Sequence, residues 1–134
     1  MNLAIEMHDS ECLAVETEID RVGSVVLDAY VHRSMGEPGC AEGEGGIQRI
    51  RIAVKDMVVE GDLGELPAYV YEGSLEVGGT VFDNMIPFPR TYAATARLKM
   101  MLSDDARVVV ISGTTLTILA ESDFRYVERF SPIS

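Results

Sequence analysis

The sequence predicts an all-β domain built as a mostly antiparallel meander with little helix. Three observations predict this class. Apolar and polar residues alternate with a period of two through most of the chain, tight turn signals separate the alternating runs, and no long segment carries the 3.6-residue apolar stripe and caps of a helix. The runs correspond to about 8–10 strands, and a sheet of that size must close as a barrel or fold as a two-sheet sandwich to hide its edges. Both architectures satisfy the pattern.

Two runs in the first half of the chain show the alternation clearly. In residues 25–32 the odd positions are Val, Leu, Ala and Val, whereas the even positions include Asp28, Tyr30 and His32. In residues 49–55 three apolar side chains alternate with Arg and Lys. Each run therefore predicts a strand with one buried and one polar face.

The second half begins with a hairpin signal and contains the longest run. Gly78-Gly79 separates residues 75–77 from 80–82, and both positions tolerate the positive φ of a two-residue turn. Residues 91–103 alternate regularly, and on a helix the same residues would be apolar nearly all round, so the pattern favours a strand. Shorter alternating runs follow at 115–120 and 124–129. Because connections are short, we expect neighbours in sequence to pair as antiparallel neighbours.

Size and charge limit the partners that we expect. The 134 residues form one predicted domain, 1–134, with a net charge of −11. Residues 1–67 hold fourteen acidic and five basic residues, a balance of −9. Such a surface repels phosphate backbones and anionic lipid, so we expect neither nucleic-acid nor membrane binding. The acidic surface attracts a basic protein partner or serves solubility alone.

The cysteines and the N-terminal residues predict a cytoplasmic protein without cofactor or metal. Cys12 and Cys40 are too few for a disulfide framework, and neither has the spacing of a metal ligand. Cys12 lies in an alternating apolar segment, which favours a buried, inert thiol. The first residues lack the basic and apolar regions of a signal peptide, and no apolar run approaches the ~20 residues that span a bilayer.

Residues 34–46 form the longest predicted irregular stretch. The segment reads SMGEPGCAEGEGG, with five glycines and three glutamates. A mobile, solvated loop is the favoured interpretation, and a partner-contact loop is the alternative. A cation site would use Glu37, Glu42 and Glu44 as oxygen ligands, but their spacing does not match an EF-hand loop.

Residues 83–90, DNMIPFPR, place apolar side chains in a predicted loop. Its two prolines cannot donate to a sheet ladder, so we expect the chain to leave regular pairing here. The apolar residues either plug one end of the core or form an exposed patch that docks a partner. The plug is the favoured interpretation. On the second interpretation the partner-binding residues are Met85, Ile86, Phe88 and Arg90.

The polar stripe of Asp28, Tyr30 and His32 is the candidate ligand-binding set. If these side chains face a barrel lumen, they supply the polar interior that a small-ligand site needs. The opposite face of the same run is more apolar, which instead favours solvent exposure for the stripe.

No catalytic residue is predicted. Ser34, His32 and Asp28 can be combined into a triad on paper, but His32 and Ser34 lie two apart on one strand with no elbow to expose a nucleophile. The leading prediction is a non-enzymatic, acidic β domain that associates with a protein partner or with its own copies. The alternatives are a small β barrel that holds a ligand and, more remotely, an enzyme with its site in residues 32–46.

Overall fold

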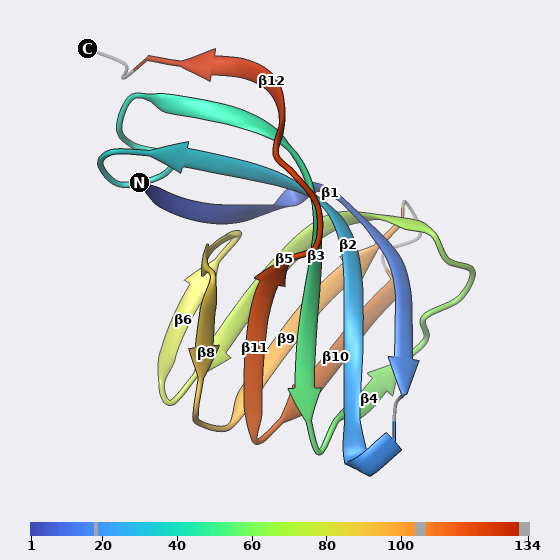
Figure 1. Ribbon diagram of the computed structural model, residues 1–134. Helices are drawn as coiled ribbons and strands as arrows, with labels where there is room; N and C mark the ends of the chain where they lie inside the picture. The colour runs from blue at the N-terminus through green and yellow to red at the C-terminus, as the bar shows by residue number, and fades with distance from the viewer. Residues whose placement is uncertain (18, 104–106, 132–134) are drawn as a thin grey trace.

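The computed structural model describes residues 1–17, 19–103 and 107–131. Every strand ladder among them is antiparallel, and the strands form one sheet that curls into a half-barrel (Figure 1). The predicted all-β class is therefore confirmed. A three-residue 3-10 segment, Ile19–Arg21, joins the first two strands and has positive φ at Asp20 and Arg21, so it acts as a turn.

The sheet follows the order β4-β10-β9-β5-β1-β2-β3-β11-β8, with β12 paired to β3, β6 to β5 and β7 to β1. The strand bounds in chain order are β1 (Asn2–Thr17), β2 (Val22–Ser34), β3 (Gly43–Lys55), β4 (Val58–Gly61), β5 (Ala68–Val77), β6 (Thr80–Asp83), β7 (Met85–Phe88), β8 (Arg90–Tyr92), β9 (Ala96–Leu102), β10 (Arg107–Gly113), β11 (Thr115–Ala120) and β12 (Arg125–Phe130).

The pairing is less local than the meander that the short connections predict. Consecutive strands pair at β1–β2, β2–β3, β5–β6 and β9–β10, whereas the other ladders join strands that are distant in sequence. The reason is the length of β1 and β3, each of which pairs with different strands at its two ends. The first part of β1 pairs with β7, and a later part pairs with β5.

The three long strands bend together and divide the sheet into two regions (Figure 1). We call the upper region the platform; it consists of residues 2–6 of β1, residues 30–34 of β2 and residues 43–47 of β3, flanked by β7 and β12. The rest of β1, β2 and β3 and the remaining strands form the body, which is the curled part of the sheet. The bend therefore separates a small sheet from the half-barrel.

The predicted alternation is confirmed in β9 and on the core-facing side of β2, but β2 also buries most residues on its other face, and residues 125–129 of β12 are exposed on both faces. In β2 the side chains of Val25, Leu27, Ala29 and Val31 are fully buried. The run at 91–103 is extended, with buried side chains at every second position of β9, but it is interrupted because β8 ends at Tyr92 and β9 begins at Ala96. The break has a topological cause: β8 pairs with β11, whereas β9 pairs with β5 and β10.

The Gly78-Gly79 hairpin is also confirmed. Val77 pairs with Thr80 across the turn, and the two glycines have φ values of 53° and 87°. Residues with a Cβ rarely adopt these angles, so glycine at both positions sets this reversal.

The prediction of a long irregular stretch at 34–46 is partly wrong. β2 extends through Ser34 and β3 begins at Gly43, so the irregular segment is residues 35–42. A Cβ at Gly45 would lie 2.2 Å from the Tyr30 hydroxyl, and one at Gly46 would lie 2.6 Å from Cζ of Phe124. These two glycines therefore allow aromatic rings to pack on the strand, and they do not mark a loop.

The prediction that residues 83–90 leave regular pairing is also wrong. Residues 85–88 form β7, whose register with β1 places Pro87 opposite Ala4. Proline is tolerated here because β7 pairs with a neighbour on one side only, as an edge strand can. Ile86 and Phe88 point into the core, whereas Met85 and Pro87 are half-buried.

One apolar core lies inside the curled sheet and beneath the platform. Its members come from eight strands of the body and platform and from β7, and they include Ile5, Met7, Leu27, Ile52, Ile86, Leu98, Met100, Ile111 and Leu116. Within the described ranges, no helix is long and apolar enough to cross a bilayer.

Candidate functional site

The three predicted ligand residues lie on the face of β2 opposite the core, so they do not point into a lumen. Asp28 is partly exposed and accepts a hydrogen bond from Nε of Arg49 at 3.3 Å. Tyr30 and His32 are buried, each with 8% of its surface exposed. None of the three side chains therefore lines an interior cavity, and the rings of Tyr30 and His32 are shielded from solvent.

His32 contacts side chains from β1 and from β12, the strand beyond β3. Its ring stacks on Phe130 of β12 with centroids 4.8 Å apart, and its Nε2 lies 2.9 Å from a carboxylate oxygen of Glu6 on β1. His32 Nδ1 is buried and has no hydrogen-bond partner among the described residues. The ring therefore fixes the platform chiefly through stacking and through Glu6.

Tyr30 lies beside His32 and belongs to the same cluster. Its hydroxyl donates a hydrogen bond to Glu128 of β12, and its ring meets that of His32 edge-on at 5.3 Å. Burial raises the pKa of Tyr30, and the hydrogen bond to Glu128 and the nearby carboxylate charges raise it further. The phenol therefore keeps its proton and holds β12 against β2.

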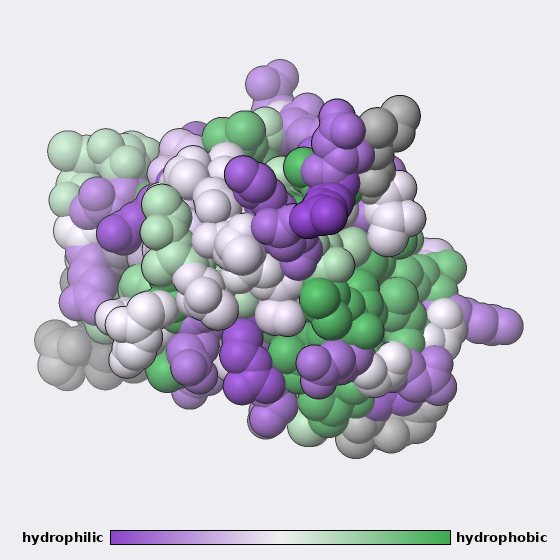
Figure 2. All heavy atoms as spheres, turned by 90° about the horizontal axis from the view of Figure 1, so that it is seen from below, coloured by the Kyte–Doolittle hydropathy of each residue, from purple (hydrophilic) through white to green (hydrophobic). Residues whose placement is uncertain are grey.

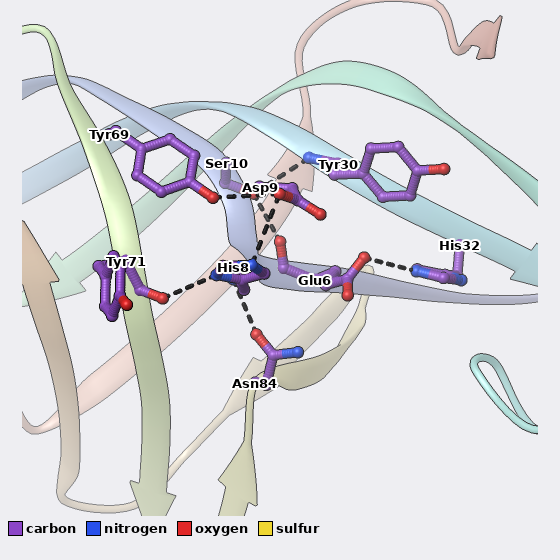
Figure 3. Close-up of polar contacts among 9 residues, drawn as sticks. All are labelled: Glu6, His8, Asp9, Ser10, Tyr30, His32, Tyr69, Tyr71 and Asn84. Carbon is purple, nitrogen blue, oxygen red and sulfur yellow. Dashed lines mark hydrogen bonds and ion pairs between the residues drawn. The ribbon is translucent and has the colours of Figure 1, made fainter.

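A bulge in β1 produces the bend next to this cluster (Figure 3). The register between β1 and β2 slips between Glu6 and Glu11, and Asp9 adopts a positive φ of 77°. The hydroxyl of Ser10 donates to the Glu6 carbonyl at 2.7 Å and accepts from the Tyr30 backbone N–H at 3.0 Å. Ser10 thus satisfies the backbone groups that the bulge removes from the ladder.

His8 and Asn84 tie the bulge to the neighbouring elements (Figure 3). The His8 backbone N–H donates to Oδ1 of Asn84 at 2.7 Å, and the ring Nδ1 donates to the Tyr71 carbonyl at 2.8 Å. The backbone of Asn84 also accepts from Met7 and donates to Gly73. A cavity of about 450 Å³ lies beside these groups. Because most of their polar atoms already have hydrogen-bond partners, these residues serve a structural role: they hold the bulge of β1 against β5 and residue 84.

The triad that the sequence allows on paper is not assembled. Ser34 donates its hydroxyl proton to the Glu42 carbonyl at 2.6 Å. His32 pairs with Glu6, and Asp28 pairs with Arg49. Each candidate side chain is thus engaged with a group outside the proposed triad.

The three loop glutamates do not converge on a common point. Glu42 pairs with Arg129 of β12, and Glu44 pairs with Arg33 of β2 at 3.2 Å. Within the part of the chain that the structure describes, no group of three His, Cys, Asp or Glu side chains is arranged to hold a metal ion.

A largely apolar groove of about 610 Å³ lies along β7, between the start of β1, residues 35–42 and β8. We call it the β7 groove. Most of its walls are apolar, and among the described residues that line it only Glu37 and Arg90 have charged side chains; the apolar contributors include Leu3, Pro38, Met85, Pro87, Phe88 and Pro89. Its volume lies in the range of specific binding sites in proteins.

Three of the four predicted partner-binding residues line this groove. Met85, Phe88 and Arg90 do so, although Phe88 is 5% exposed and packs in the core on the same face of β7 as Ile86, which is fully buried and does not line the groove. The sequence did not indicate Leu3, and it offered Glu37 and Pro38 only within the alternative of a partner-contact loop at 34–46; these residues reach the groove through the pairing of β1 with β7 and the path of residues 35–42.

A second apolar surface lies at the lower end of the body. Val58 and Val59 of β4 and Val108 of β10 are exposed there, and apolar side chains gather on the side where β4 lies (Figure 2). β4 pairs only with β10, so one of its edges is free within the described sheet.

No protein-family model matches the chain, and no curated protein or solved structure matches it either. The geometry of the groove and of the polar cluster is therefore the basis for any functional conclusion.

Proposed function

We propose that this chain is a protein-association domain and that the β7 groove is its docking surface. One observation carries the proposal: an edge strand and a neighbouring loop leave Met85, Pro87 and Pro38 half-buried around one concave, mostly apolar volume of about 610 Å³. Apolar surface gathered in one hollow gains free energy when a partner removes it from water.

The composition of the groove favours a protein segment as its occupant. Methionine and proline form much of the wall, and a methionine side chain adapts its shape to different apolar groups. The charged groups of Glu37 and Arg90 are both exposed, as expected for the polar rim that surrounds the apolar centre of a protein interface. Rim charges of opposite sign would orient the partner and discriminate against a wrong one.

The half-barrel body is consistent with this role. Its interior is filled by the side chains of the core, so the body serves as a rigid support for β7 and for the loop at 35–42. The acidic surface as a whole keeps non-cognate acidic proteins away through repulsion.

Site-specific photo-crosslinking tests the proposal. A benzophenone amino acid replaces Met85 in the full chain, and the matched control carries it at Met101, a half-buried methionine on β9 outside the groove. The protein is irradiated in the cells that produce it. We expect a discrete protein adduct from position 85 and none from position 101. Equal adducts at both positions, or none at position 85 in a folded variant, would overturn the proposal.

A further inference from the structure

We infer that the β7 groove docks the same groove of a second copy, so that the chain forms a two-fold symmetric dimer. The inference rests on the proposed function, because it identifies the partner that this groove accepts. In a two-fold interface one patch contacts itself, and a contact of residue i with residue j is repeated as a contact of j with i.

The charges of the groove satisfy this condition. Glu37 on the loop and Arg90 at the start of β8 both line the groove, and neither forms an ion pair within the described part of the chain. A two-fold axis through the groove would set Glu37 of each copy against Arg90 of the other. Two equivalent ion pairs would then form, and no like charges would need to face each other.

The net charge of the protein supports this surface for self-association. At −11, two copies repel one another over most of their surfaces. The charged side chains of the β7 groove sum to zero, because Glu37 and Arg90 balance. Copies can therefore approach through the groove without the repulsion that other faces impose.

An exposed apolar side chain beside the groove also fits a second copy. Met35 is 81% exposed and precedes Gly36, whose carbonyl accepts a hydrogen bond from the groove-lining Asn2 at 2.7 Å. A copy seated on the groove would extend over this edge and cover Met35. Burial of Met35 and Met85 together supplies apolar contact next to the ion pairs.

The free edge of β4 is the rival surface for pairing of two copies, and its charge disfavours it. Val58 and Val59 are exposed there, but Glu60, Asp62 and Glu65 follow within the same short segment without a basic residue. Two copies joined at β4 would bring six carboxylates together, whereas the β7 groove pairs opposite charges.

Charge-swap variants of the full chain test the inference by sedimentation velocity over a range of protein concentrations. The variants are Glu37→Arg, Arg90→Glu and the double variant; Glu60→Arg on β4 is the control. All three positions are exposed, so the fold should persist, and circular dichroism checks this. We expect each single groove swap to weaken dimerisation about tenfold or more and the double variant to restore it.

The direction of the effect separates local pairing from overall charge. Glu37→Arg changes the net charge from −11 to −9, so reduced repulsion alone would strengthen association. Glu60→Arg makes the same change in net charge, so weaker dimerisation of Glu37→Arg beside no more than a slight strengthening by Glu60→Arg supports the groove. The double variant keeps the wild-type net charge, and its recovery completes the test.

Four results would overturn the inference. A dimer that does not respond to the groove swaps and that Glu60→Arg clearly strengthens, because the carboxylate repulsion at β4 is relieved, would place the interface at β4. Single swaps without recovery in the double variant would exclude the reciprocal ion pairs. A wild-type monomer whose position 85 crosslinks a different protein would refute the symmetric dimer and retain the proposed function, whereas a monomer without crosslinks would refute both.

Discussion

Replacing Ile86 by Ala should destabilise the protein strongly, whereas replacing its neighbour Met85 by Ala should leave stability nearly unchanged. Ile86 is fully buried, while Met85 is half-buried in the wall of the β7 groove. The truncation of Ile86 removes three carbon groups at about 0.8 kcal/mol each, or about 2.4 kcal/mol. The cavity left behind brings the expected loss to about 3–4 kcal/mol. For Met85→Ala we expect about 0.5 kcal/mol.

Urea unfolding followed by circular dichroism measures both values, because the midpoint falls while the slope m stays constant when stability alone changes. Sedimentation of the same variants adds the functional contrast: Met85→Ala should weaken association while lowering the urea midpoint only slightly. An Ile86→Ala protein with wild-type stability, or a Met85→Ala protein destabilised as much as Ile86→Ala, would refute the assignment of β7 to one buried and one docking face. Ile86→Asp is not a test of association, because a buried carboxylate would unfold the protein.

Three further predictions concern the platform and the bend. Gly45→Ala should lower the free energy of unfolding in urea by about 1–3 kcal/mol, because its Cβ would lie 2.2 Å from the Tyr30 hydroxyl. A variant with wild-type stability would show that the Tyr30 ring does not pack against residue 45. At pH 8, a water-soluble thiol reagent should label exposed Cys40 at once and Cys12 only on unfolding, since burial raises the pKa of Cys12 to about 11. If mass spectrometry shows that the two cysteines of the folded protein are labelled at the same rate, this prediction is wrong. Asn84→Ala should lower the free energy of unfolding by about 2 kcal/mol in urea or thermal unfolding, because alanine is strained at the positive φ of this position and the hydrogen bond from the His8 N–H is lost; Asn84→Gly loses only the hydrogen bond and should cost less. A glycine variant less stable than the alanine variant would show that the positive φ does not strain alanine here.

The strands that could be predicted are those whose burial is local and periodic. In β2 the four apolar odd positions were expected on one face, and all four are fully buried. The same holds for β9, where Leu98, Met100 and Leu102 are buried. A strand has a side-chain period of two wherever it lies, so the sequence alone carries this information.

The features that could not be predicted depend on partners distant in sequence. Gly45 and Gly46 were interpreted as loop residues, but their lack of a side chain makes room for the rings of Tyr30 on β2 and of Phe124, which precedes β12. Pro87 was expected to end pairing, and it is accommodated because β7 happens to lie at an edge. Local composition cannot show which strand becomes an edge.

The β7 groove could be predicted only in part for the same reason. Met85, Phe88 and Arg90 were singled out because an apolar, proline-rich segment is unusual in a loop, and these residues line the groove. Ile86 was included with them because the face of each residue on β7 depends on the register with β1. Glu37, on a separate loop, carried no signal that linked it to Arg90.

The measurement that tests the central claim most directly is methyl NMR of the full chain labelled at the methionine methyl carbons. Met85 reports the groove, Met101 reports an outer face of β9, and Met7 and Met100 report the core. In a dilution series, or on adding the protein captured at position 85, the account predicts that the Met85 resonance shifts while those of Met7, Met100 and Met101 stay constant. An invariant Met85 resonance in conditions where sedimentation shows association would contradict the account, because the association would then involve another surface.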